Sequence, residues 1–99
     1  MPSTIPQIDE SSAKLVVSAR PRRGLTLQNL SPVNIYVRWD GNPNVTASNN
    51  SPDSGIRLVP GALLDLAGDW ESSRNANNAV YAISEPGSGS GNELRYIVR

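Results

Sequence analysis

Three acidic residues and a tryptophan form the densest group of side chains in this sequence that can do chemistry. Asp65, Asp69 and Glu71 fall within seven residues, and Trp70 lies between the last two. A glycosidase needs two carboxylates that face each other across a cleft, whereas an aromatic ring beside carboxylates suits a sugar-binding site. Nothing in the sequence fixes a carboxylate opposite this group, so we expect no catalytic pair. Asp69, Trp70 and Glu71 are candidate glycan contacts, with a solvated loop as the alternative.

The residues that are missing exclude most other catalytic chemistry. The chain has no Cys and no His, which excludes Ser–His–Asp and Cys–His nucleophiles, disulfides, and zinc sites built on those ligands. Residues 40–44, Asp-Gly-Asn-Pro-Asn, imitate the opening of a calcium loop, but Val45 and Ser51 replace the glycine and glutamate that such a loop requires. We therefore expect a protein that is not an enzyme and that holds neither a cofactor nor a metal.

The densest basic segment is Arg20-Pro21-Arg22-Arg23. Binding to nucleic acid normally needs an excess of positive charge, and this chain balances nine Lys+Arg against nine Asp+Glu. We therefore expect these arginines to pair with an acidic neighbouring protein rather than with nucleic acid. Eight of the nine cations are Arg, the basic residue that is enriched at protein contacts.

Short apolar runs alternate with turn residues from Lys14 onward, a spacing typical of an all-β sandwich or barrel. A chain of 99 residues forms one domain with a thin core, which disulfides, a metal or a partner chain usually support. Because there is no room for crossover helices, the strands should pair antiparallel. We predict a single antiparallel β-sandwich or barrel of about seven or eight short strands. The expected strands are residues 15–17, 25–30, 35–39, 56–59, 63–66, 79–83 and 93–98, with a weaker one at 45–47.

Three local patterns predict how these strands are connected. Residues 25–30 and 35–39 both alternate apolar and polar side chains, and a short break at Ser31-Pro32 separates them, so we predict a hairpin. Pro60-Gly61 predicts a tight turn, because Gly supplies the positive φ that its second central position needs. Residues 86–91, Pro-Gly-Ser-Gly-Ser-Gly, predict a flexible tip.

Residues 1–13 are expected to form an extended N-terminal arm, and residues 14–99 the β-domain. Pro2 and Pro6 favour extended backbone. Two interpretations of the arm stay open: a disordered terminus, or a segment that orders on a neighbouring chain with Ile5 and Ile8 as its anchors. The first residues lack the basic and apolar regions of a signal peptide, and no apolar run is long enough to cross a membrane.

Several strand and turn segments follow one another in a familiar order. They are Leu-Thr-Leu-Gln-Asn-Leu at 25–30, Ile-Tyr-Val-Arg at 35–38, Gly-Ile-Arg-Leu at 55–58 with Pro60-Gly61, Val-Tyr-Ala-Ile-Ser at 80–84, and Leu94-Arg95. In this order they resemble small all-β structural proteins encoded in the virion gene clusters of tailed bacteriophages. The resemblance covers residues 24–98 and consists of strands and turns, so it carries over no catalytic residue.

The resemblance implies a virion structural protein, such as a head decoration protein, a head fibre or a tail component. We expect a capsid decoration (cement) protein on the capsid surface, made in the host cytoplasm, which binds the major capsid protein as a homo-oligomer with a trimer favoured. The expected contacts with capsid or neighbouring subunits are Ile5, Ile8, Arg20, Arg22 and Arg23. The alternative is a tail or fibre module that binds host-surface carbohydrate through Asp69, Trp70 and Glu71.

Overall fold

The computed structural model describes residues 7–18, 24–47, 52–67, 79–89 and 91–98, and it confirms the predicted all-β class. No helix that could cross a membrane occurs in these ranges. The eight strands within these ranges are β1 (Gln7–Ile8), β2 (Lys14–Val17), β3 (Gly24–Asn29), β4 (Ile35–Arg38), β5 (Ile56–Leu58), β6 (Leu63–Ala67), β7 (Val80–Ser84) and β8 (Asn92–Val98).

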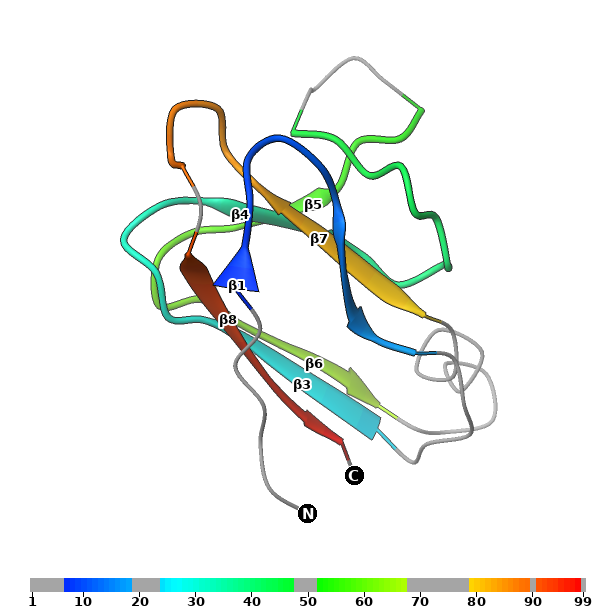
Figure 1. Cartoon of the computed structure of the whole chain (residues 1–99). Coiled ribbons are helices and arrows are strands. Elements are labelled where there is room, and N and C mark those ends of the chain that lie inside the picture. Colours follow the sequence, from blue (N-terminus) through cyan, green and yellow to red (C-terminus); the bar gives the residue numbers. More distant parts are fainter. Residues whose placement is uncertain (1–6, 19–23, 48–51, 68–78, 90, 99) are drawn as a thin grey trace.

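The strands form two antiparallel sheets of four that stack into a sandwich. One sheet has the order β1-β8-β3-β6 and the other has the order β2-β7-β4-β5. Figure 1 shows β3, β6 and β8 in the lower layer and β4, β5 and β7 in the upper one. The chain changes sheet at every connection except the one from β4 to β5. This is the strand order of an eight-stranded jelly roll, an architecture found in viral capsid and lectin domains.

The predicted hairpin between residues 25–30 and 35–39 is wrong. Strand β3 pairs with β6 and β8, whereas β4 pairs with β5 and β7, so the two segments lie in opposite sheets. The side chain of Asn29 holds the connection between them, because its Nδ2 donates to the carbonyls of Val33 and Leu58, each at 2.7 Å. Alternation in a sequence indicates which face of a strand is buried, but it does not indicate which strand lies beside it.

The space between the sheets is filled by one cluster of buried apolar side chains. In β4, Ile35 and Val37 are fully buried while Tyr36 and Arg38 alternate with them on the other face. The turn predicted at Pro60-Gly61 is present: Gly61 has a φ of 82°, and the N–H of Ala62 donates to the carbonyl of Val59 at 2.9 Å. The cluster consists of Ile8, Val16, Val17, Leu25, Leu27, Ile35, Val37, Leu58, Val80, Ala82 and Leu94.

The N-terminal boundary of the folded part lies earlier than predicted. Gln7 and Ile8 pair with Glu93 and Asn92 of β8, and the side chain of Ile8 is fully buried in the core. Ile8 therefore contributes to the stability of its own subunit and is not an exposed anchor for a neighbouring chain. Its environment comes from a strand 84 residues away in sequence, which the local pattern of residues 1–13 cannot reveal.

The glycine-rich connection between β7 and β8 is held by hydrogen bonds, in contrast to the flexible tip predicted for it. The N–H groups of Gly87 and Gly89 both donate to the carboxylate of Glu10 at 2.7 Å, and the N–H of Glu10 donates to the carbonyl of Gly89. Gly87 and Gly89 have φ values of 87° and 74°, which residues with a side chain rarely adopt. The Nδ2 of Asn92 donates to the carbonyls of Ile8 and Gly89. The connection thus forms a small cradle of backbone amides for the Glu10 carboxylate.

Replacing Glu10 by glutamine should lower the free energy of unfolding by about 1 kcal/mol, because hydrogen bonds to an ionised acceptor are stronger than those to a neutral one. Urea denaturation followed by tryptophan fluorescence measures this change. The matched control is Glu93→Gln, since Glu93 is exposed on β8. Equal effects of the two substitutions would show that the cradle contributes nothing specific.

Candidate functional site

Most of the residues singled out in the sequence lie outside the described part of the chain. These are Ile5, Arg20, Arg22, Arg23, Asp69, Trp70 and Glu71. Ile8 lies in the core. Asp65, the remaining acid of the cluster, is exposed on β6 and accepts a hydrogen bond from the Thr26 hydroxyl of the neighbouring strand at 3.0 Å. Within the described residues, no three acidic side chains come close enough together to hold a metal ion.

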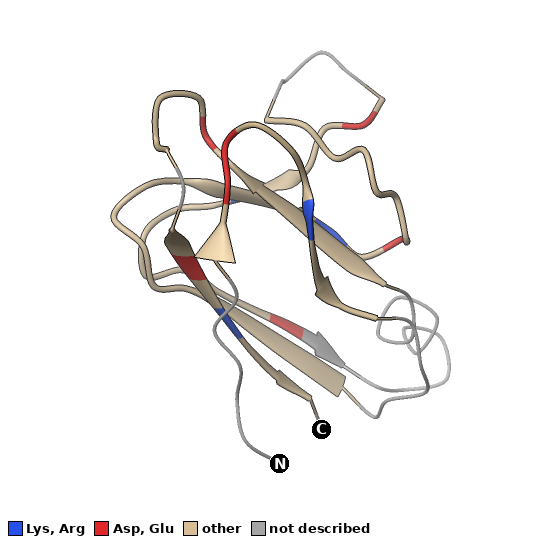
Figure 2. Cartoon of the chain, in the orientation of Figure 1, with Lys and Arg blue, Asp and Glu red and all other residues tan. Residues whose placement is uncertain are grey.

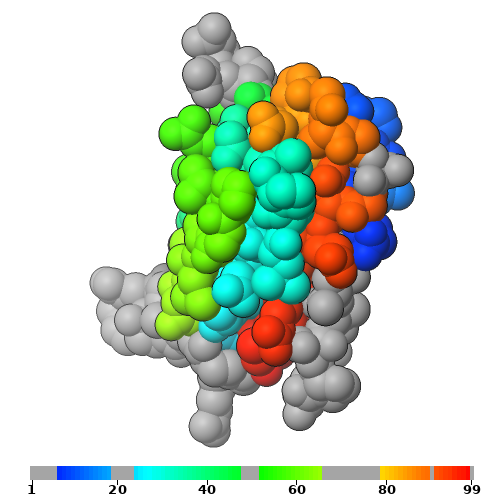
Figure 3. Space-filling view, turned by 90° about the vertical axis from the view of Figure 1, so that its left-hand side faces the viewer, coloured from blue at the N-terminus to red at the C-terminus, as the bar shows by residue number. Residues whose placement is uncertain are grey.

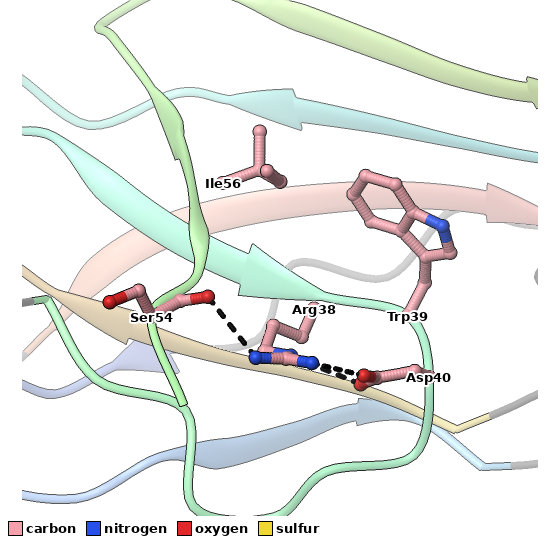
Figure 4. A pocket seen from close by; sticks show the side chains of 5 residues that line it. All are labelled: Arg38, Trp39, Asp40, Ser54 and Ile56. Carbon is pink, nitrogen blue, oxygen red and sulfur yellow. Dashed lines mark hydrogen bonds and ion pairs between the residues drawn. The ribbon is translucent and has the colours of Figure 1, made fainter. Parts of the chain in front are cut away.

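An open depression of about 320 Å³ lies where β4 ends and β5 begins. Its walls are Arg38, Trp39, Asp40, Ser54 and Ile56. Figure 4 shows the indole of Trp39 and the side chain of Ile56 on one side of β4, and the Arg38 guanidinium with the Asp40 carboxylate on the other. The alternation of β4 causes this division, because successive side chains point to opposite faces of a strand. Trp39 is half-buried and packs against the core cluster.

Arg38 organises the long loop that follows β4. Its Nε donates to Asp40 Oδ1 at 3.2 Å and its Nη2 donates to Asp40 Oδ2, which makes a bidentate ion pair. Its Nη1 donates to the carbonyls of Pro52 and Ser54, at 2.6 and 3.3 Å. One guanidinium therefore joins the beginning of the loop to its end, which only the planar, five-donor fork of Arg can do.

The electrostatics of this ion pair follow from its geometry. Hydrogen bonding from Arg38 is the main cause that lowers the pKa of Asp40 below its ordinary value. The same contact raises the pKa of Arg38. Both groups are therefore ionised at neutral pH, and the two charges cancel within the depression.

We expect the loop anchored by Arg38 to loosen in acid. The lowered pKa of Asp40 means that its ionised form stabilises the native loop, and this contribution is complete above the unfolded-state pKa of about 3.9. The contribution is lost as the pH falls through the lowered native pKa. Amide hydrogen exchange of Thr46 and Gly55, whose N–H groups are bonded within the loop, measures the effect. In Arg38→Lys the same amides should exchange faster at neutral pH, and unchanged exchange would contradict the anchor.

The segment that imitates a calcium loop uses its oxygens to accept hydrogen bonds from its own chain. The N–H of Asn42 donates to Asp40 Oδ1, and the N–H of Asn44 donates to Asn42 Oδ1 at 2.8 Å. Asn42 Nδ2 also donates to Asp53 Oδ1 at 2.8 Å across the loop. These are the side chain-to-backbone turns typical of Asn and Asp. The strand suggested at 45–47 is reduced to a single parallel bridge between Thr46 and Ser54.

Exposed apolar side chains gather along one side of the sandwich, in a group that we call the edge strip. It consists of Leu30, Ile56, Val59 and Leu63, which are between 40% and 62% exposed. Strands β5 and β6 are edge strands of their sheets, and the Pro60-Gly61 turn connects them on this side. Figure 3 shows this segment, in yellow-green, as one continuous column beside the cyan residues. Leu15, on the edge strand β2, is the other large exposed apolar side chain of the described residues.

Figure 2 shows acidic and basic residues spread over the strands and loops of the described part of the chain. Acidic residues outnumber basic ones in the described ranges. The described residues therefore offer no excess of positive charge that would suit nucleic acid.

Comparison with protein-family models, with curated proteins and with solved structures finds no match to this chain. The depression and the edge strip are therefore the features from which a function can be argued. Sequence reasoning missed both, although one signal was available: Asp40 follows Arg38 by two residues and opens the Asn-rich loop.

Proposed function

We propose that this protein is a non-enzymatic structural protein of a bacteriophage virion. In this proposal it is a capsid decoration protein that stabilises the head shell as a homo-oligomer. The observation that carries the proposal is the edge strip, because several large exposed apolar side chains along one edge of a sandwich suit a contact with another chain. The edge strip gives each copy of the chain the same surface for contact with another chain.

Two further features support an assembly role. The jelly-roll strand order is one that viral capsid domains use, although a fold alone does not define a function. The chain also has no net charge, so copies repel one another little. In the assembled shell, a trimer over the junctions between major capsid subunits would gain its affinity from many weak contacts. Ile5, Arg20, Arg22 and Arg23 remain the proposed contacts with the capsid or neighbouring copies.

Self-association is tested by sedimentation velocity on the wild-type chain, Leu63→Glu and Leu15→Glu. Leu63 is 62% exposed in the edge strip, and Leu15 is 49% exposed on the edge strand β2. We expect the wild type and Leu15→Glu to sediment as the same oligomer and Leu63→Glu to sediment as a monomer with an unchanged Tm. A wild-type chain that stays monomeric at millimolar concentration would overturn this part of the proposal.

The location in the virion is tested on particles of the phage that encodes the chain. Gold-labelled antibody should mark the head surface, and particles lacking the protein should lose DNA at a lower temperature than the wild type. Labelling confined to the tail would contradict the decoration role and favour a tail module.

A further inference from the structure

The depression at the end of β4 has one apolar wall and one polar wall, and these two walls indicate what kind of ligand would fit. Trp39 and Ile56 form an apolar wall, while Arg38, Asp40 and Ser54 form a polar one. Concave sites that bind small molecules usually have this composition, an apolar lining with a few fixed polar groups. Figure 4 shows the two apolar side chains and the ion pair on opposite sides of β4, at the end of the strand where β5 begins.

The apolar wall is left uncovered by the described part of the chain. Ile56 pairs with Val37 across β4 and β5, yet Val37 is fully buried whereas Ile56 is 53% exposed. Ile56 is more exposed than Val37 because β5 is the last strand of its sheet and has no neighbouring strand on its outer side among the described residues. Beside Ile56, the half-buried indole of Trp39 offers an aromatic surface whose position is fixed by its packing against the core.

The polar wall is held by hydrogen bonds and still has one donor and one acceptor to offer. Of the five N–H donors of Arg38, four are directed at Asp40, Pro52 and Ser54, which leaves one on Nη2. Among the described residues, Asp40 Oδ1 accepts from Arg38 and Asn42, and Oδ2 accepts from Arg38 alone, which leaves Oδ2 a lone pair. The side chain of Asp40 is 46% exposed. One donor on Arg38 and one acceptor on Asp40 thus have no partner among the described residues.

We propose that this depression binds a neutral sugar ring. The ion pair cancels the charge of the polar wall, so the wall attracts neither anions nor cations and favours an uncharged ligand. A pyranose ring has an apolar C–H face that fits against Trp39 and Ile56, and neighbouring hydroxyls that can donate to Asp40 and accept from Arg38. The residues that form the site are different from the candidate glycan contacts at 69–71, and the site neither requires nor excludes a place on the capsid.

Tryptophan fluorescence tests the proposal, because Trp39 and Trp70 are the only tryptophans of the chain. The full-length Trp70→Phe variant leaves Trp39 as the sole reporter, and adding Leu63→Glu keeps subunit contacts away from Ile56. This protein is titrated with glucose, galactose, mannose and N-acetylglucosamine, and with glucuronate as a charged probe. We expect a saturable change in emission with at least one neutral sugar. No change with any neutral sugar, or a change with glucuronate alone, would overturn the proposal.

A pair of matched variants locates the site. Ile56→Thr removes apolar surface from the depression and should weaken sugar binding about tenfold. Val59→Thr makes the same kind of change in the edge strip outside the depression, and it should leave the affinity unchanged. Sugar-induced NMR shifts should be largest for the amides of residues 38–40 and 54–56. Shifts centred elsewhere, or equal losses in the two variants, would show that the sugar does not bind in the depression.

Discussion

Replacing Gly55 by alanine is expected to lower the free energy of unfolding by about 3 kcal/mol. A Cβ atom at this position would lie 2.8 Å from Val45 Cγ2, 2.9 Å from Tyr36 Cβ and 2.9 Å from the backbone nitrogen of Val37. These distances are too short for carbon contacts, and the backbone of β4 cannot move without disturbing its pairing with β5 and β7. At Gly55 the loop after β4 therefore lies too close to β4 and Val45 to leave room for a side chain.

Thermal unfolding followed by circular dichroism measures the effect of Gly55→Ala. For a domain of this size, a loss of this magnitude lowers Tm by more than about 10 °C. The control is Gly41→Ala, because Gly41 has open space around it and only its φ of 80° opposes a side chain. Its cost should be about 1 kcal/mol. If Gly55→Ala is no more harmful than Gly41→Ala, the loop and the sheet are not packed as described.

Replacing Asn29 by aspartate, a substitution that keeps the shape of the side chain, is expected to lower the free energy of unfolding by about 4 kcal/mol. Asn29 is fully buried, and its Nδ2 donates to two backbone carbonyls, those of Val33 and Leu58. Its Oδ1 accepts from both the N–H and the hydroxyl of Ser31. Aspartate keeps the shape but removes both donors, so a carboxylate would face two carbonyl oxygens inside the sandwich.

The pH dependence distinguishes this mechanism from a simple loss of packing. Burial raises the pKa of the new carboxyl group above its unfolded value, so the folded state of Asn29→Asp favours the protonated form. The destabilisation should therefore be largest at neutral pH and should shrink as the pH falls below the raised pKa. Denaturant unfolding at a series of pH values measures this, with Asn44→Asp, at an exposed position, as the control. A loss that does not depend on pH would mean that no buried carboxylate forms.

The edge strip and the depression share Ile56, so self-association and sugar binding should compete for this side chain. If copies associate through the strip, Ile56 becomes buried and the sugar site is partly covered. Sedimentation of the wild type with and without saturating sugar then reports a competition between self-association and sugar binding. The two proposals remain separable, because Leu63→Glu acts on the strip alone and Asp40 belongs to the depression alone.

The sequence by itself determined the all-β class, most strand positions and the turn at Pro60-Gly61. These features depend on local rules: alternation of side chains between faces, and the φ values that Pro and Gly permit. The same alternation placed Ile35 and Val37 on the buried face of β4 and Tyr36 and Arg38 on the other, as the structure shows. Such rules act over a few residues and need no knowledge of the rest of the chain.

Only the tertiary structure decided which strands are neighbours and which polar side chains hold them. Asn29 takes the next inward-facing position of β3 after Leu25 and Leu27, but one of the two carbonyls that it binds, that of Leu58, comes from the opposite sheet. Glu10 reads as part of a polar arm, yet it binds the backbone of Gly89, which is 79 residues away. Arg38 and Ile56 meet at a depression only because β5 returns beside β4. These contacts depend on the path of the whole chain, and their free energy is gained only once distant segments have been brought together.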